Sequence, residues 1–376
     1  MRAERVSLLM TRAPLARPFE NRWQRFESWT KVLVRVEAGG LTGLGECTAM
    51  ETPYYNYETT ETAWHVLERY LIPLVLRSGT TDPEAAARAW AHVNGHEEAK
   101  AALECALWDL RAKAAGVPLG VALGGERATV PVGATVGIEP TIDALVDAVA
   151  RAHEAGYARV RIKIRQGWDV EPVKAVRSAL PDVPLIADAN AAYGAEDLPH
   201  LRALDGLGLL ALEQPLKSRL IAESAALQAS LATPVCLDES VKSLADVRQA
   251  LDAGACRAVN VKAGRVGGLA EARRIHDACR DHGVPAFVGA KYDFGVGRWT
   301  NIALGTLANM TLPSDVGPTA RYYRDDGTTP QVCFVSPGRV APRPAPGLGV
   351  EITDSAHVVR AQSFCPTSDK EPRWRA

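Results

Sequence analysis

Three acidic residues lie at equal intervals in the middle of the chain: Asp188, Glu213 and Asp238 are separated by 25 residues each. Each stands at the end of a short apolar run that is typical of a buried strand. Three carboxylates that converge on one point do not all stay ionised without a cation. Because all-oxygen ligation favours Mg²⁺ over zinc, the spacing predicts a Mg²⁺ site on these residues, which Mn²⁺ or Co²⁺ can also fill. Each acid alone could be explained as a cap of the helix that follows it. Helix capping does not explain why all three acids stand at the same place in successive strand–helix units.

Two lysines flank the three acids in the order of the predicted strands. Lys163 ends one strand, and the alternation of side chains along that strand puts Arg161 on the same side. Lys262 ends a strand beyond the acids. Positive charge nearby, from Arg161 and the metal, lowers the pKa of a lysine toward the range of a useful base. We therefore expect Lys163 and Lys262 to act as acid/base groups. Supporting roles are expected for the polar neighbours Arg161, Asn190 and Glu239, and Glu239 is placed to pair with Lys262.

This arrangement suits removal of a proton α to a carboxylate. The metal would neutralise the carboxylate and stabilise the dianionic enediolate while one lysine takes the proton. The second lysine can return a proton to the other face, which gives racemisation, or stabilise the departure of a leaving group. Two other classes of protein stay open: an aldolase that uses a barrel lysine as a Schiff base, and a non-catalytic barrel that binds a metabolite.

A regular alternation of strands and helices positions these residues. From about residue 130, short β-branched runs alternate with amphipathic helical stretches, the pattern of a parallel sheet covered by helices. The predicted strands are 130–136, 160–164, 185–187, 209–212, 235–237, 258–261, 286–288 and 310–313. We therefore expect an α/β fold, a modified TIM barrel of the (β/α)7β type over 127–325, with its site at the carboxyl ends of the strands.

The N-terminal part of the chain has a different pattern. Residues 1–126 combine alternating strands with helical stretches at 60–72 and 97–115 and predict an α+β capping domain. The first of these helices is expected to stop before Pro73, which cannot continue the hydrogen-bond ladder. The tail, 326–376, is rich in Pro and Gly. We expect it to pack back on the capping domain and complete it.

Composition excludes several classes of protein. The 376 residues are 47% hydrophobic and 23% charged, with a net charge of −1, so nothing drives the chain toward nucleic acid or an anionic membrane. No apolar stretch approaches the ~20 residues of a membrane span. The seven cysteines are scattered without a Cys-x-x-Cys motif, which indicates a reducing, cytoplasmic location. The expected partners are a small-molecule carboxylate and further copies of this chain.

These motifs resemble the enolase superfamily, muconate-lactonizing subgroup, and within it the o-succinylbenzoate synthase/N-succinylamino acid racemase family. The resemblance runs through nearly the whole chain. In the N-terminal part it rests on Gly43-Leu44-Gly45-Glu46 and Ala102-Leu103-Glu104-Cys105-Ala106-Leu107-Trp108-Asp109. In the barrel it rests on Ile162-Lys163-Ile164, Asp188-Ala189-Asn190, Glu213-Gln214-Pro215, Leu237-Asp238-Glu239-Ser240 and Asn260-Val261-Lys262.

The resemblance implies the same metal and acid/base residues. It also implies capping loops, around 19–29 and 50–57, that close over the substrate, with Phe19, Tyr54 and Tyr55 among the contacts. No histidine ends the strand 286–288, so the His–Asp dyad of mandelate racemase is absent.

Two departures from the family pattern concern the site. The family's Lys-x-Lys is here Arg161-Ile162-Lys163, and an arginine keeps the charge but cannot act as a base. Where the family carries Gly-Gly-Met-Leu-Glu-x-Gly, this chain has Gly289-Ala290-Lys291-Tyr292-Asp293-Phe294-Gly295. We expect this loop to line the pocket, which makes substrate contacts of Lys291, Tyr292, Asp293 and Phe294. Lys291 would either bind a second polar group of the substrate or extend to solvent.

The expected activity is therefore Mg²⁺-dependent abstraction of a proton α to a carboxylate. Racemisation of an N-acylamino acid is the first expectation, and o-succinylbenzoate-type dehydration or a cycloisomerisation is the alternative. The segment Leu312-Pro313-Ser314-Asp315 lacks the Asp-x-Asp of the dipeptide epimerases, which disfavours a substrate with a free α-amino group.

Overall fold

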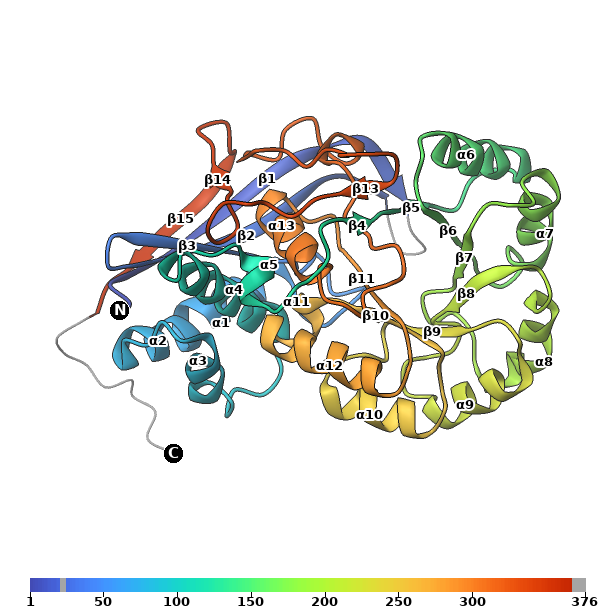
Figure 1. The fold of residues 1–376 in the computed structure, drawn as a ribbon, viewed down its shortest axis with the longest axis horizontal. Coiled ribbons are helices and arrows are strands. Elements are labelled where there is room, and N and C mark those ends of the chain that lie inside the picture. The colour runs from blue at the N-terminus through green and yellow to red at the C-terminus, as the bar shows by residue number, and fades with distance from the viewer. Residues whose placement is uncertain (21–24, 367–376) are drawn as a thin grey trace.

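The computed structural model describes residues 1–20 and 25–366. Its N-terminal part is built on a four-stranded antiparallel sheet in the order β15-β1-β2-β3. The strands are β1 (Arg5–Glu20), β2 (Arg25–Ala38), β3 (Leu41–Cys47) and β15 (Val358–Phe364). The tail thus returns to the N-terminus, where β15 pairs with β1 along the edge of this sheet (Figure 1). The division of the chain into domains at 126/127 stays a prediction.

Helices cover one side of this sheet. They are α1 (Thr60–Val66), a π-helical turn (Leu67–Leu71), α2 (Ile72–Ser78), α3 (Pro83–Ala89), α4 (Glu97–Ala114) and α5 (Leu119–Ala122). The predicted stop before Pro73 is wrong, because the chain continues through the π turn into α2. Pro73 lies in the first turn of α2, directly after the π turn. The second predicted helix, 97–115, is confirmed as α4.

The second sheet has seven parallel strands in the order β11-β10-β9-β8-β7-β6-β5. Their bounds are β5 (Gly133–Val136), β6 (Arg159–Lys163), β7 (Leu185–Asp188), β8 (Leu209–Glu213), β9 (Val235–Leu237), β10 (Ala258–Val261) and β11 (Ala286–Val288). Figure 1 shows helices between successive strands on the outside of this curved sheet. These helices are α6 (Ile142–Glu154), α7 (Val170–Ala179), α8 (Leu198–Leu201), α9 (Ile221–Ser230), α10 (Leu244–Asp252), α11 (Ala263–Val266), α12 (Leu269–Asp281) and α13 (Gly295–Leu304). The predicted α/β barrel fold is confirmed.

The barrel closes without a regular eighth strand. The backbone N–H of Asp315 donates to Val288 on β11 (2.8 Å), and the N–H of Gly133 at β5 donates to Ser314 (2.8 Å). Residues 312–315 therefore occupy the eighth position, although the predicted strand 310–313 is wrong. Pro313 has no N–H to donate, which limits the pairing to an isolated bridge.

The predicted strand 130–136 is also divided. Its first part is β4 (Val130–Pro131), which pairs with β13 (Arg339–Val340) from the tail instead of joining the barrel. A further short pair joins β12 (Thr328–Thr329) to β14 (Glu351–Ile352). Within the described ranges, no helix is both long and apolar enough to cross a bilayer, and none of the seven cysteines forms a disulfide.

Candidate active site

The predicted acid/base and acidic residues lie at the ends of five neighbouring strands. Asp188 and Glu213 are the last residues of β7 and β8, and Asp238 directly follows β9. Lys163 ends β6 and pairs in register with Asp188, which pairs in turn with Glu213. Lys262 directly follows β10. The strand order therefore places the three acids between the two lysines.

Each acid is paired with a different cation. Lys163 Nζ donates to Asp188 Oδ2 (2.5 Å), and Arg161 Nη1 donates to both carboxylate oxygens of Glu213 (2.9 and 3.1 Å). Lys262 Nζ lies 2.6 Å from Asp238 Oδ2. The three acids are at most 1% exposed, so little water screens these pairs.

The three carboxylates affect one another's ionisation. Burial raises the pKa of Glu213, and the charges of Asp188 and Asp238 raise it further, although Arg161 acts in the opposite direction. Burial also opposes ionisation of Asp238, but Arg265 and Lys262 outweigh it and hold the pKa of this carboxyl well below its usual range. Negative charge is therefore concentrated at the ends of β7, β8 and β9.

The surroundings of Lys262 differ from the prediction in two respects. Lys262 pairs with Asp238, while Glu239 accepts a hydrogen bond from Asn190 Nδ2 (3.0 Å), so the expected Lys262–Glu239 pair is wrong. The reason is that Asp238 follows the neighbouring strand β9, and both of its carboxylate oxygens lie within hydrogen-bond distance of Lys262 Nζ (2.8 and 2.6 Å). Burial favours the neutral amine of Lys262, but Asp238 outweighs burial and raises the pKa of Lys262 above its usual value. The expected lowering of a lysine pKa is not found at this residue.

Arg161 is the centre of a buried polar network. Its Nη2 donates to Asp315 Oδ2 (2.6 Å), and its Nε and Nη2 both reach Thr135 Oγ1 (3.2 and 3.0 Å). Asp315 also pairs with Arg159 (2.6 Å). The alternation along β6 predicted that Arg161 and Lys163 share one face, and both line the same cavity.

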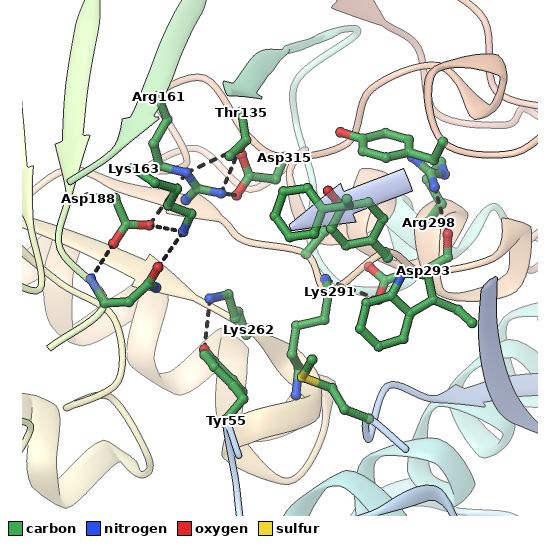
Figure 2. Close-up of a pocket in the computed structure, with 17 residues that line it drawn as sticks. Tyr55, Thr135, Arg161, Lys163, Asp188, Lys262, Lys291, Asp293, Arg298 and Asp315 are labelled. Atoms are coloured by element: carbon green, nitrogen blue, oxygen red, sulfur yellow. Dashed lines mark hydrogen bonds and ion pairs between the residues drawn. The ribbon is translucent and has the colours of Figure 1, made fainter. Parts of the chain in front are cut away.

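This cavity lies where the barrel meets the N-terminal part (Figure 2). Arg161, Lys163 and Asp188 are at one end, and Asp293 and Arg298 are at the other. Its lining combines polar groups with an apolar wall that includes Phe19, Trp29, Met50, Tyr292 and Tyr322. The rings of Phe19 and Trp29 lie 4.7 and 5.6 Å from that of Tyr292. A ligand that reaches Lys163 would therefore lie against aromatic rings.

Five of the seven predicted substrate contacts line this cavity: Phe19, Tyr55, Lys291, Tyr292 and Asp293. The other two do not lie at the cavity. Tyr54 is 58% exposed and does not line the cavity. Phe294 is fully buried, because it precedes α13 and its ring packs edge-on against Tyr323. Residues 21–24 of the predicted closing loop 19–29 lie outside the described residues.

Lys291 does not extend to solvent, since its side chain is 9% exposed. Its ammonium group pairs with Glu98 at the start of α4, and Glu98 also accepts a hydrogen bond from Thr48. Burial opposes ionisation of Glu98, but Lys291 outweighs it and lowers the pKa of Glu98. One of the two expected positions of Lys291 is therefore excluded, and its amine contacts the N-terminal part of the chain.

Several residues that contact the site residues were not predicted. Arg265, on α11, lies 2.7 Å from Asp238 and 3.0 Å from the hydroxyl of Tyr55. Asp315 and Thr135 hold Arg161 from the closing segment and from β5. No sequence pattern marks these residues, because each reaches the site from an element whose neighbours are known only in three dimensions.

The donor chemistry of the three acids fits a hard divalent cation such as Mg²⁺. They offer carboxylate oxygens, they are buried, and each contributes to the same concentration of negative charge. Among the described residues, no three carboxylate, imidazole or thiol groups already converge as they would around an ion. The three acids instead pair with Lys163, Arg161, Lys262 and Arg265.

Family models match both parts of this chain. Residues 4–124 match the N-terminal domain of mandelate racemase/muconate lactonizing enzyme, and residues 144–356 match the enolase C-terminal domain-like family. The chain belongs to the enolase superfamily. The predicted family is therefore confirmed, and this member of the superfamily is an enzyme.

Individual relatives agree with this assignment. The enolase-superfamily chain is 44% identical to an o-succinylbenzoate synthase from Geobacillus kaustophilus, over 96% of both chains. It is 41% identical to an N-succinylamino acid racemase from Amycolatopsis, over 93% of this chain and 95% of the relative. A crystal structure of an enolase-superfamily member from Listeria innocua covers 98% of this chain and 100% of its own, with a TM-score of 0.93 and 31% identity.

Proposed function

We propose that this enzyme removes the proton α to a carboxylate, with racemisation of an N-acylamino acid as its main reaction. The observation that carries the proposal is the strand order, in which Lys163 on β6 and Lys262 after β10 lie on either side of the three acids. Two amines on opposite sides of a bound substrate can exchange protons with both faces of its α-carbon.

We assign Asp188, Glu213 and Asp238 to hold Mg²⁺. When bound, the ion would neutralise the substrate carboxylate and thereby make the α-proton more acidic. The roles of neighbouring side chains in the protein follow from their contacts. Arg161 and Asn260 both donate hydrogen bonds to Glu213 (2.9 and 2.8 Å), and together they fix the orientation of its carboxylate.

The two lysines carry the proton transfer. One Nζ accepts the α-proton, and the electron pair of the broken C–H bond delocalises into the carboxylate to give an enediolate. A proton from the other Nζ then forms a C–H bond on the opposite face, which inverts the configuration. Lys262, whose pKa Asp238 raises, enters as the ammonium, and this favours Lys163 as the first base for one of the two enantiomers.

A second candidate reaction is dehydration of the o-succinylbenzoate synthase type. The name of the Geobacillus relative, at 44% identity, favours it. In that reaction the same Lys163 amine would take the α-proton and then give it to the departing hydroxyl group, which leaves as water, while the Lys262 ammonium would stabilise the enediolate. Both reactions share proton abstraction and differ in the fate of the enediolate.

Solvent deuterium separates the two reactions. The enzyme would be incubated with Mg²⁺ in D₂O with N-succinyl and N-acetyl derivatives of apolar amino acids and, separately, with a cyclohexadiene carboxylate. Proton NMR and optical rotation would be measured over time. Racemisation predicts loss of the α-proton signal together with loss of optical rotation. Dehydration of a cyclohexadiene carboxylate that carries a hydroxyl on the carbon next to the α-carbon predicts an aromatic product and little exchange into recovered substrate.

Variants and chelation test the assigned residues. Lys163→Ala and Lys262→Ala should each lower the racemisation rate by about 100-fold or more, while Lys174→Ala, on the outside of α7, should leave it unchanged. EDTA should abolish the reaction, and Mg²⁺ should restore it. Activity that survives EDTA and is trapped by borohydride would indicate a Schiff-base aldolase, and an unaffected Lys163→Ala variant would contradict the role assigned to Lys163.

A further inference from the structure

Tyr55, from the N-terminal part of the chain, lies between two lysine amines of the barrel. Its ring centroid is 5.5 Å from Lys262 Nζ and 5.4 Å from Lys291 Nζ, both within the range of a cation–π interaction. Its hydroxyl also accepts a hydrogen bond from Lys262 Nζ (3.1 Å). Figure 2 shows this hydrogen bond at the edge of the cavity. The ring therefore connects the amine that we assign to catalysis with Lys291, which replaces the methionine of the related family.

Lys291 is itself fixed from the N-terminal part. Its amine pairs with Glu98, which is fully buried. Its backbone carbonyl accepts a hydrogen bond from Lys31 Nζ (3.1 Å), and Lys31 is also fully buried. Because both ends of the residue are held by buried groups, the Lys291 amine has little freedom to leave the ring of Tyr55.

We propose that Lys291 is a positioning residue that acts through Tyr55 on Lys262. Glu98 fixes the Lys291 ammonium, the ammonium holds one region of the Tyr55 ring, and the Tyr55 hydroxyl in turn fixes Lys262 Nζ. The proposal rests on the function proposed above, in which Lys262 serves one face of the α-carbon. It predicts that loss of Lys291 impairs proton exchange on that face and spares the face served by Lys163.

A structural role alone predicts a different outcome. If the Lys291–Glu98 pair only joined the barrel to the N-terminal part, its loss would loosen the whole cavity and slow exchange on both faces equally. The rate of proton exchange on each face of the α-carbon therefore distinguishes the two roles. Each face is measured separately by following α-proton exchange in D₂O from each enantiomer of one N-acylamino acid.

The experiment first uses Lys262→Ala to identify the enantiomer whose exchange depends on Lys262. For that enantiomer, Lys291→Met should lower the exchange rate by about 10-fold, while exchange of the other enantiomer changes by less than about 3-fold. Lys291→Arg keeps a cation that can pair with Glu98 and should retain more exchange than Lys291→Met. Equal losses for both enantiomers, or no loss, would overturn the proposal.

Two further variants keep the test decisive. Lys291→Met leaves Glu98 buried without its main partner, so Lys291→Met/Glu98→Gln provides a neutral pair if the single variant unfolds. Tyr55→Phe removes the hydroxyl that contacts Lys262, so adding Lys291→Met to this variant should lower the exchange rate little further. A decrease as large as the one that Lys291→Met causes in the wild type would overturn the route through Tyr55. Absence of exchange of either enantiomer by the wild type would contradict the proposed function instead.

Discussion

At the scale of single residues, Arg161 binds two acidic side chains at once, whereas a lysine in its place could bind only one of them. Its planar guanidinium contacts Glu213 through Nη1 and Asp315 through Nη2, and all three side chains are buried. The planar guanidinium, which can donate in two directions, therefore joins the end of β6 to both β8 and the closing segment, and a positive charge alone would not do so.

We expect Arg161→Met to be more harmful than Arg161→Lys. Methionine leaves Glu213 and Asp315 without the shared cation, which should lower the free energy of unfolding by about 3–5 kcal/mol at neutral pH. Lysine keeps the charge but reaches only one of the acids, and should cost about 1–3 kcal/mol. Urea denaturation of the three proteins measures both losses. An Arg161→Lys protein as stable as the wild type would show that the bidentate geometry contributes nothing, and equal stability of the two variants would show that the charge alone contributes nothing.

At the scale of elements, β3 and α4 pack so closely that their contact requires glycine. A Cβ atom at Gly45 would lie 2.0 Å from the backbone carbonyl oxygen of Ala102 on α4, and a Cβ at Gly43 would lie 2.1 Å from that of Ala106. Backbone atoms of a helix cannot move aside as a flexible side chain can. The same strand carries Glu46, which accepts hydrogen bonds from the N–H groups of Phe294 and Gly297 at the start of α13.

Gly45→Ala should therefore destabilise the protein by about 3 kcal/mol or more. Gly317→Ala is the matched control, because a Cβ there meets its nearest neighbour, the hydroxyl of Tyr322, at an ordinary 3.5 Å. The control should change stability by no more than about 0.5 kcal/mol. Thermal unfolding of both variants tests the comparison, and a stable Gly45→Ala protein would mean that β3 and α4 can separate.

Elements also show what the sequence could predict. Strands β9, β10 and β11 have the predicted bounds, because short buried β-branched runs between helices are a local signal. The ends of β6 to β10 position the acids and lysines, and their place after the short apolar runs made the centre of the site predictable as well. The closing segment at 312–315, the position of Phe294 and the pairing of Lys262 with Asp238 depend on contacts between distant parts of the chain. A pattern along one sequence does not contain those contacts.

At the scale of the whole molecule, one buried carboxylate joins the N-terminal part to the barrel. Glu104, on α4, accepts hydrogen bonds from the backbone N–H groups of Leu269 and Ala270 at the start of α12 (2.7 and 3.0 Å). It also accepts one from Trp108 Nε1 (2.8 Å). An acid at a helix N-terminus is favourable when ionised, yet burial is the larger effect here and raises the pKa of Glu104 to about 7.

The raised pKa of Glu104 makes the contact between the N-terminal part and the barrel sensitive to pH. A carboxyl whose pKa is higher in the folded than in the unfolded protein contributes stability that is fully present below its unfolded pKa and is lost as the pH rises through its folded pKa. For Glu104 these values are 4.5 and about 7. The difference corresponds to at most about 3 kcal/mol, lost between about pH 5 and pH 8.

Glu104→Gln removes this titration while keeping the size of the side chain. The amide places an NH₂ group against one of the donors, so the variant should be less stable than the wild type at pH 5. As the pH rises to 8, only the wild type has to ionise a buried carboxyl at this contact, and the deficit of the variant should shrink by about 1–3 kcal/mol. Urea denaturation across this pH range measures the difference, in which the titration of groups common to both proteins cancels. A deficit that stays constant with pH would show that Glu104 is already ionised at pH 5, and that the helix N-terminus and Trp108 outweigh its burial.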